Sequence, residues 1–371
     1  MTTILMTGVT GTVMGPVAAL LLKEGHTILA LVRSGSRVPT EISCHRRFVV
    51  IQGDITENLA GVLPSFVGEW RGKVHQVLHG AASVKFIETP QKEVWRTNVT
   101  GTQNVLWLAK QLGVPQFHHV STAYVCGDSE FFSEDDLPVG VGRNAYEESK
   151  IVAERMVREG GFSYSIYRIP VVVGDSQTGM ISSFTGYYGF FAPFFELHHA
   201  LRQKWVREPE KLGQAGIWVK EGRVYLPIAV PCSLRGPLNI VPLDWVARMM
   251  SRAVTLRAEG ETFHITHPNP PAVRSVIANS LRYLGFDGMR PGEEPSGREE
   301  GLARSLQEGI RRNIQPYRPY TTKEREVFHD KRLREALGSS YEEPPSMLCL
   351  IPTLLRFALE RNFGRSEKVR V

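Results

Sequence analysis

The chain has 371 residues, of which 42% are hydrophobic, 22% charged and 9% aromatic. These proportions are ordinary for a soluble globular protein, and the length suffices for a sizeable core in one large α/β domain or a domain with an appendage. The formal net charge is +6, and the first half holds no block of lysine and arginine. This mild basicity fits an anionic cofactor or substrate better than nucleic acid, so we expect no nucleic-acid partner.

The cysteine and histidine spacing predicts no metal site. The four cysteines form no Cys-x-x-Cys pair, and the adjacent pairs His118-His119 and His198-His199 lack metal-ligand spacing, which favours structural roles. The N-terminus begins a strand almost at once without a signal-peptide pattern, and no apolar run reaches the ~18–20 residues of a membrane span. We therefore expect a reducing, cytoplasmic setting and no transmembrane segment.

The N-terminal region reads as a strand, a glycine-containing loop, a helix and a second strand. These elements are expected at Thr3–Thr7, at 7–15, at about 16–24 and at Thr27–Val32. In this setting the loop binds a dinucleotide pyrophosphate at the helix N-terminus. The residues expected to bind the cofactor here are Thr7, Gly8, Thr10, Gly11, Thr12 and Val13.

Two glycines of this loop have distinct expected roles. Gly8 permits the tight turn, and Gly11 lets the backbone approach the phosphates. The third glycine of such loops is displaced, because position 14 is Met and the glycine follows at Gly15. How the helix packs on the strand at Met14 is therefore an open question.

The end of the second strand indicates which dinucleotide is bound. Sites for NAD commonly place an acidic residue there, on the ribose 2′-hydroxyl. Here the sequence is Arg33-Ser34-Gly35-Ser36-Arg37, with no acid, and a guanidinium with hydroxyls suits a 2′-phosphate. We predict NADPH, with Arg33 as the main contact and Arg37 as a second.

The following strands continue the same alternation with helices. A third strand ends before Asp54 and Ile55, which are placed for the adenine amino group and ring, and a fourth ends before Ala81 and Ala82, small enough for the backbone to lie beside the cofactor. A helix from 97 to about 111 opens with Asn98. The alternation predicts an α/β fold with a Rossmann-type doubly wound parallel sheet, whose ligands sit at the carboxyl ends of the strands.

Tyr146 and Lys150 are four residues apart in a helical stretch and so share one face, one turn apart. A tyrosine hydroxyl, with a pKa of about 10, is a poor acid-base group in water. A neighbouring ammonium is expected to lower the pKa of Tyr146, so that the pair can move a proton on or off a carbonyl oxygen. By itself the motif is better explained as an ordinary helix face, because Tyr-x-x-x-Lys occurs often by chance.

Other motifs support an acid-base role for Tyr146 and Lys150. The fifth strand ends in Ser121-Thr122, and a hydroxyl at a strand end followed by Tyr-x-x-x-Lys resembles the extended short-chain dehydrogenase/reductases. In order and spacing the supporting pieces cover about the first half of the chain: Thr-Gly-x-x-Gly at 7–11, Gly-Asp-Ile at 53–55, Ala81-Ala82, Asn98, Ser121-Thr122, Tyr146 with Lys150, and Arg168-Ile169-Pro170.

Within that superfamily the chain is most similar to the thioester reductase and fatty acyl-CoA reductase branch, also called male sterility proteins. The phrases that carry this resemblance lie at 53–57 (GDITE), 81–86 (AASVKF), 121–125 (STAYV), 146–150 (YEESK) and 172–179 (VVGDSQTG). Two positions depart from the pattern, Met14 and Ile169, where Arg would be expected before Pro170.

The resemblance implies roles for individual residues. Tyr146 would donate a proton to the developing alkoxide or hemithioacetal oxygen, and Lys150 would lower its pKa and hold the nicotinamide ribose. Thr122 would hydrogen-bond the same substrate oxygen, with Ser121 as the second candidate. Supporting and cofactor contacts are implied for Asn98 and for Pro170 to Val173.

The implied reaction is NADPH-dependent reduction of an acyl thioester on CoA or a carrier protein, or of a lipophilic carbonyl compound derived from one. A sugar dehydratase would need an Asp-Glu pair where this chain has Ala123 and Tyr124. A reductase or epimerase acting on a sugar derivative or a natural-product ketone remains open, because it needs only Thr, Tyr and Lys. A non-catalytic NADP sensor predicts loss of Tyr146 or Lys150, and both are present.

The amino-acid composition changes in the second half of the chain. Residues 181–197 interleave aromatics with glycines, which is awkward for a regular helix and favours the wall of an acyl pocket over a plain core segment. We assign 1–180 to the Rossmann domain, returning at about 236–268, and 181–235 with 269–371 to a mostly helical substrate-binding part. The segment 347–363 is expected to be helical and to cap the pocket, form a homodimer interface or lie on a membrane surface.

Overall fold

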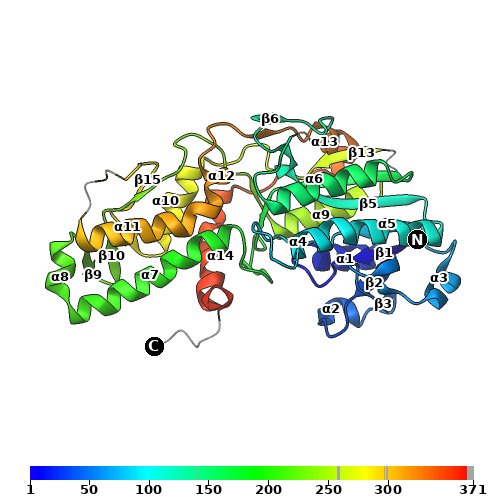
Figure 1. Cartoon of the computed structure of the whole chain (residues 1–371), viewed down its shortest axis with the longest axis horizontal. Coiled ribbons are helices and arrows are strands. Elements are labelled where there is room, and N and C mark those ends of the chain that lie inside the picture. Colours follow the sequence, from blue (N-terminus) through cyan, green and yellow to red (C-terminus); the bar gives the residue numbers. More distant parts are fainter. Residues whose placement is uncertain (139, 257–259, 296, 298–299, 366–371) are drawn as a thin grey trace. The chain divides into compact units, whose positions relative to one another are not determined.

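The computed structural model describes residues 1–365 except 139, 257–259, 296 and 298–299. The chain divides into two compact units (Figure 1). Unit 1 comprises 1–172, 243–268 and 328–343, and unit 2 comprises 173–242, 269–327 and 344–371.

Unit 1 is built on a seven-stranded sheet in the order β13-β7-β5-β4-β1-β2-β3. All its neighbouring strand pairs are parallel, as the alternation of strands and helices predicted. The carboxyl ends of β1, β4 and β5 therefore meet at one edge. The strands are β1 (Thr3–Thr7), β2 (Thr27–Val32), β3 (Phe48–Gln52), β4 (Gln76–His79), β5 (Gln116–Thr122), β7 (Ser163–Ile169) and β13 (Glu261–His264).

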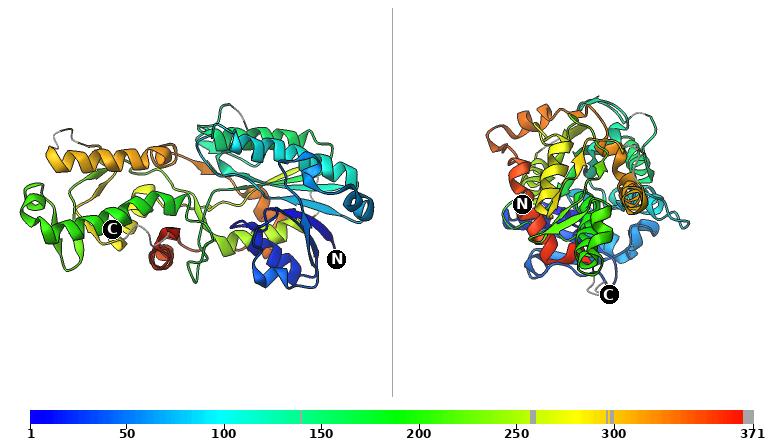
Figure 2. Two further views of the ribbon diagram at one scale, coloured as in Figure 1. Left: turned by 60° about the horizontal axis from the view of Figure 1, so that its bottom comes forward. Right: turned by 90° about the vertical axis from the view of Figure 1, so that its left-hand side faces the viewer.

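Helices cover both faces of this sheet, as the left view of Figure 2 shows. On one face α5 packs against α6, and alternate strand residues such as Leu5, Val77 and Phe117 join their apolar sides in a buried core. On the other face α1 packs against α9. The helices of unit 1 are α1 (Met14–Lys23), α2 (Thr40–Ser43), α3 (Pro64–Trp70), α4 (Glu93–Trp95), α5 (Gly101–Leu112), α6 (Ala145–Arg158), α9 (Leu243–Val254) and α13 (Lys331–Leu337).

The boundaries of unit 1 differ from those expected. The return segment begins at Leu243 rather than at about 236, and 328–343, which we had assigned to the C-terminal part, also belongs to unit 1. The carboxylate of Glu134 explains the second difference, because it accepts hydrogen bonds from the backbone of His264 in β13 (3.0 Å) and of Leu333 in α13 (3.1 Å). The contact with Leu333 joins residues 199 positions apart, so periodicity gave no sign of it.

Unit 2 contains a long helix where an irregular segment was expected. Helix α7 (Tyr187–Arg207) runs through Pro193. The aromatic residues Tyr187, Phe190, Phe191 and Phe194 stand at helical spacing and form a buried stripe, with ring centroids as close as 4.9 Å. They therefore pack in the core of unit 2, and Phe194 with its neighbours Pro193 and Leu197 also lines a cavity of about 110 Å³.

Several helices and short strands complete unit 2. The C-terminal helix α14 was expected over 347–363 and ends slightly earlier. Short strands form a sheet in the order β14-β10-β9 and a pair β11-β15. These elements are α8 (Pro209–Gln214), β9 (Trp218–Lys220), β10 (Arg223–Tyr225), β11 (Ala229–Val230), β12 (Ile240–Pro242), α10 (Val273–Tyr283), β14 (Phe286–Asp287), β15 (Arg290–Pro291), α11 (Gly301–Ile314), α12 (Arg318–Thr321) and α14 (Met347–Glu360).

The remaining short strands are β6 (Phe131–Phe132), β8 (Val171–Val173) and β16 (Val327–Phe328).

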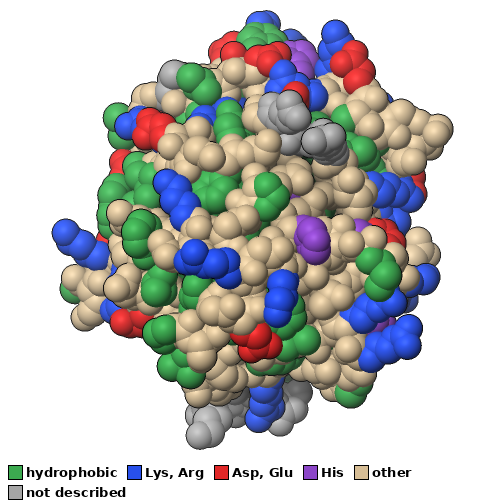
Figure 3. Space-filling model, turned by 90° about the vertical axis from the view of Figure 1, so that its right-hand side faces the viewer, with side chains coloured by type: hydrophobic (Ala, Val, Ile, Leu, Met, Phe, Trp, Pro, Cys, Tyr) green, Lys and Arg blue, Asp and Glu red, His purple; other side chains and the backbone are tan. Residues whose placement is uncertain are grey.

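Among the described residues, no helix is both long and apolar enough to cross a membrane. On the face shown in Figure 3, lysine and arginine side chains are spread out, with acidic side chains among them. That face does not carry a charge of one sign throughout.

Candidate active site

The end of β1 is tied to the end of β4 by Thr7. Its Oγ1 accepts hydrogen bonds from the backbone of Gly80 (3.2 Å) and Ala81 (3.1 Å). Gly8 has a φ of +83°, and a Cβ there would lie 2.7 Å from the nitrogen of Ala81. Only glycine fits this turn, so the sequence-predicted Thr7, Gly8 and Ala81 come together at the carboxyl edge of the sheet.

The loop after Gly8 leads into the N-terminus of α1. The Gly11 N–H donates to the Gly8 carbonyl (2.8 Å), and the helix begins at Met14 with no side-chain cap at Val13. Thr10 and Gly11 are exposed, and Thr12 and Val13 are partly exposed. Because a helix N-terminus favours negative charge, this loop fits the pyrophosphate of a dinucleotide.

Met14, which departs from the glycine pattern, is accommodated by a second glycine. Its side chain is 2% exposed and covers the backbone of Gly80, where a Cβ would lie 2.5 Å from Met14 Cγ and closer still to Sδ. Such loops usually have a small residue at this position of the helix. Here the helix has Met14, and the small residue that makes room for it is Gly80 at the end of β4. The phosphate loop keeps its turn with Met14 in place.

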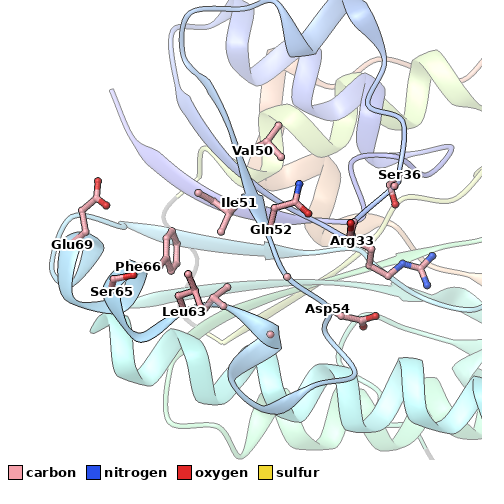
Figure 4. Close-up of a pocket in the computed structure, with 15 residues that line it drawn as sticks. Arg33, Ser36, Val50, Ile51, Gln52, Asp54, Leu63, Ser65, Phe66 and Glu69 are labelled. Atoms are coloured by element: carbon pink, nitrogen blue, oxygen red, sulfur yellow. The ribbon is translucent and has the colours of Figure 1, made fainter.

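A cavity of about 930 Å³ lies beside the ends of β2 and β3 (Figure 4). Arg33, Ser34 and Ser36 line it together with Asp54. Arg37 is not among its lining residues. The residues that β3 and α3 contribute to the lining are Val50, Ile51, Gln52, Ser65, Phe66 and Glu69.

Asp54 and Ile55 differ in how far they are free for a ligand. Asp54 Oδ1 accepts from the backbone N–H and the hydroxyl of Thr56 (both 2.9 Å). Ile55 is buried in the core, and its side chain packs against the backbone of Gly101 at the start of α5. The adenine ring contact expected of Ile55 would therefore come from its backbone rather than from its side chain.

Asn98 holds the site together through its side chain. It is 1% exposed, and its Oδ1 accepts from Ser83 N (2.7 Å) while its Nδ2 donates to Ser83 O (2.9 Å) and Ser149 Oγ (2.8 Å). It lies in a π-helical turn (Arg96–Thr100), a feature often found at functional sites. The loop carrying Ala81 and Ala82 is thereby fixed to α6, and the support expected of Asn98 comes from these contacts rather than from a cofactor contact by its side chain.

Thr122 and Tyr146 meet at the end of β5. Thr122 is the last residue of the strand, and its side chain lies close enough to the Tyr146 hydroxyl to lower the pKa of that hydroxyl. Tyr146 is the second residue of α6, which is capped by Asn144 through a hydrogen bond from Glu147 N to Asn144 Oδ1 (3.0 Å). The cap fixes where the helix begins and so places Tyr146 beside Thr122.

The pKa of Tyr146 is shifted in the direction opposite to the expected one. Burial raises the pKa of Tyr146 to about 12, although the nearby Thr122 side chain lowers it, and the charge of Glu147 raises it further. Lys150 does not counter this, because its ammonium donates to the Val120 carbonyl (2.7 Å) and lies 3.0 Å from His119 Nε2. Tyr146 is therefore protonated at neutral pH.

The pKa of Lys150 is also shifted, toward the neutral range. Its side chain is 2% exposed, and burial lowers the pKa of Lys150 to about 8, while the charge of Glu154 opposes the shift. The carboxylate of Glu154 forms a buried ion pair with Arg168 on β7 (2.9 Å). This pair ties α6 to the sheet one turn beyond Lys150.

Ser121 and Pro170 lie at neighbouring strand ends. The Ser121 hydroxyl is buried and has no hydrogen-bond partner within the described part of the chain, which fits a donor or acceptor on a bound cofactor. Pro170 directly follows β7 in unit 1, whereas Val173 is the first residue of unit 2. Of the two strand ends, Ser121 thus offers a side-chain group for a ligand, and Pro170 offers its ring and carbonyl.

Sequence reasoning did not find the buried histidines behind the site. His119 was interpreted as structural, yet its ring reaches Lys150. His79 is also buried and hydrogen-bonded through both ring nitrogens, with Nδ1 2.8 Å from Thr7 Oγ1 and Nε2 3.0 Å from Thr102 Oγ1. Strand alternation was a usable signal, since it places every second residue of β5 on the face that α6 covers. Across the described ranges, no cluster of three or more His, Cys, Asp or Glu side chains could hold a metal ion.

Comparison with known proteins gives the same picture. Over residues 6–250 the chain matches the family described as male sterility protein. It is 27% identical over 256 residues to the glycine betaine reductase ATRR of Emericella nidulans, covering 66% of this chain and 18% of that protein. It is 31% identical over 163 residues to a 3-beta-hydroxysteroid dehydrogenase of Mycolicibacterium neoaurum, covering 42% of each. The chain thus spans less than half the length of these relatives.

Solved structures share the fold over nearly the whole chain. The terminal R domain from the myxalamid PKS-NRPS biosynthetic pathway has a TM-score of 0.75 at 23% identity, covering 98% of this chain and 91% of that one. A thiolation-reductase di-domain from an archaeal non-ribosomal peptide synthetase has a TM-score of 0.70 at 18% identity, covering 98% and 76%. With the family match spanning well over half of its length, the chain belongs to the male sterility protein family of extended short-chain dehydrogenase/reductases.

Proposed function

We propose that the chain is an NADPH-dependent reductase of an acyl thioester carried by CoA or by a carrier protein, or of a lipophilic carbonyl compound derived from one. The observation that carries the proposal is the pairing of the Tyr146 hydroxyl with Thr122 at the end of β5, one helical turn from the buried Lys150. A substrate carbonyl oxygen placed between the two hydroxyls would receive two hydrogen bonds.

The residues present account for the proton side of the reaction. When bound, NADPH supplies the hydride. Tyr146 is held protonated by burial and would give its proton to the oxygen that gains charge as the carbonyl carbon is reduced. Thr122 would hold the same oxygen in place. Reduction of a thioester then gives a hemithioacetal, which releases the thiol and leaves an aldehyde.

NADPH rather than NADH is supported by the charge at the end of β2. Arg33 lines the cavity with Ser34 and Ser36, and no acidic residue follows β2 directly. A guanidinium can bind a 2′-phosphate with two hydrogen bonds, whereas an acid would be needed to favour the free 2′-hydroxyl.

The acyl thioester is supported by family membership and by the motif phrases at 121–125 and 146–150. The thiolation-reductase di-domain among the structural neighbours joins a reductase to a thiolation domain, and we infer a similar carrier-bound substrate here. An alternative is a reductase or epimerase acting on a sugar derivative or a ketone, since a hydroxysteroid dehydrogenase is among the relatives that the chain matches.

A substrate panel separates these functions. NADPH oxidation would be measured with acyl-CoA, acylated carrier protein, fatty aldehyde, a hydroxysteroid ketone and a nucleotide sugar, with NADH in parallel. We expect turnover on the acyl thioesters and NADPH preferred over NADH. Tight NADPH binding without turnover on any acyl substrate would reject the proposed function. Turnover on the sugar or the ketone alone would establish the alternative.

A further inference from the structure

The ammonium of Lys150 has two partners on β5. Its Nζ donates to the Val120 carbonyl at 2.7 Å and lies 3.0 Å from Nε2 of His119. An ammonium has three donors and no acceptor, so His119 must accept through Nε2 and carry its own proton on Nδ1. Two of the three ammonium protons are thereby assigned to the strand.

We propose that His119 is a positioning residue for Lys150: a neutral imidazole that anchors the ammonium to β5 and leaves its third proton for the reacting centre. The inference rests on the proposed function and deepens it, because it explains how the Tyr-x-x-x-Lys lysine is aimed. His119 itself need not touch substrate or cofactor.

The geometry leaves Lys150 little freedom. Its side chain is 2% exposed and His119 is 1% exposed, so water cannot replace a lost acceptor without opening the packing between β5 and α6. Losing one of two anchors would let a four-carbon side chain rotate about the remaining one. Tyr146 lies one turn closer to the N-terminus of α6, so the third proton of Lys150 has to point in that direction to serve the reacting centre. Without the second anchor, its direction would no longer be fixed.

His119 is held neutral by what surrounds it. Burial, followed by the charge of Lys150 and then by His79, keeps the pKa of His119 well below its ordinary value. The ring of His79 on β4 lies 5.5 Å from that of His119, between centroids, and is fixed by Thr7 and Thr102. The charge of Glu154, on the same helix, acts on Lys150, and the charge of Glu147 acts on Tyr146.

The neighbouring His118 provides a matched control. It is also fully buried on β5, but it faces the other side of the sheet, where Nδ1 lies 2.8 Å from the Tyr167 hydroxyl. The test compares His119→Leu with His118→Leu, and adds His119→Gln because the Gln amide oxygen can stand near the place of Nε2.

The first readout needs no substrate. Isotope-labelled lysine NMR would follow the titration of Lys150 in the cofactor-free protein, with Lys150→Met identifying its signal. Because an acceptor favours the charged ammonium, we expect His119→Leu to lower the pKa of Lys150 by about one unit or more, and His118→Leu and His119→Gln to leave it within about half a unit. Equal Lys150 titration in wild type and His119→Leu would overturn the inference.

The second readout is turnover. We expect His119→Leu to reduce kcat by roughly 10- to 100-fold with little change in KM, and to shift the pH profile, while His119→Gln recovers most of the rate. Equal rates for the Leu and Gln variants would contradict a positioning role. If the wild type reduces no acyl thioester, the proposed function fails, but the NMR titration still decides the role of His119. If His119→Leu does not fold, the comparison of His119→Gln and His119→Met by the same titration decides it, equal values again overturning the inference.

Discussion

The packing of Met14 on Gly80 leads to a prediction about stability and cofactor binding together. In Gly80→Ala the new Cβ would lie 2.5 Å from Met14 Cγ, far inside ordinary contact distance. Gly80 does not have a positive φ, so alanine can adopt its backbone conformation, and the strain comes from Met14 alone. Met14 is 2% exposed, so its side chain has little room to rotate away, and we expect the start of α1 to shift.

The magnitude follows from two opposing effects. Overpacking a buried contact costs ~1–3 kcal/mol, whereas Gly→Ala gains about 0.4–1 kcal/mol by restricting the unfolded chain. From the middle of each range, we expect a net destabilisation of roughly 1.3 kcal/mol. Since the phosphate loop runs directly into α1, we also expect weaker NADPH binding.

Chemical denaturation and fluorescence titration with NADPH would measure both effects. Met14→Ala alone creates a cavity, and combining it with Gly80→Ala should cost at least ~1 kcal/mol less than the sum of the single variants, because the added methyl enters the space that Met14 leaves. Gly68→Ala is the control, since a Cβ at Gly68 in α3 meets nothing within 4 Å. Additive costs, or an unaffected Gly80→Ala, would refute this account of Met14.

Two further predictions concern specificity and pH. Arg33→Ala should reduce the preference for NADPH over NADH by roughly 10- to 100-fold, and Arg37→Ala, outside the cavity lining, should change it less; an unchanged ratio of the two Kd values in Arg33→Ala would reject the assignment. Burial lowers the pKa of His79 and of His118 from 6.5 to about 3. Below pH 6.5 the unfolded chain therefore binds more protons than the native one, and each histidine should cost ~1.4 kcal/mol of stability per pH unit as the pH falls toward 3. Burial raises the pKa of Glu134 from 4.5 to about 7, which opposes this loss between those two values. The histidines outweigh it, because burial also lowers the pKa of His119 and of His264. Urea denaturation at pH 7, 5.5 and 4.5 would check the sign, and stability that rises on acidification to pH 4.5 would contradict it.

Much of unit 1 could be predicted from the sequence because its information is local. Apolar runs, turn glycines and capping residues specify each strand and helix, and parallel topology brings strand ends such as Thr7, Ala81 and Thr122 to one edge. That Thr122 and Tyr146 act on one oxygen was implied by the family resemblance instead. The site was predictable to the extent that position along a strand or helix determines it.

The remainder depends on contacts between distant residues. The backbone partners of Glu134 in β13 and α13, the fit of Met14 on Gly80, and the acceptor that His119 offers to Lys150 all join residues that no periodicity relates. The direction of the Tyr146 pKa shift was also missed, since burial outweighs the effect expected from a lysine whose ammonium is engaged by β5. In α7 the helical spacing of the aromatic residues was present in the sequence, but the glycines obscured it.

The central claim is that Tyr146 delivers the proton to a thioester carbonyl. The most direct measurement is aldehyde or alcohol formation from an acylated carrier with NADPH by wild type, Tyr146→Phe and the control Tyr164→Phe, whose hydroxyl bonds Arg158 at the other end of α6 (3.1 Å). We predict that Tyr146→Phe loses ~10²- to 10⁴-fold in kcat while still binding NADPH, and that Tyr164→Phe stays within a few-fold of wild type. Turnover by Tyr146→Phe at the rate of the control would contradict the account.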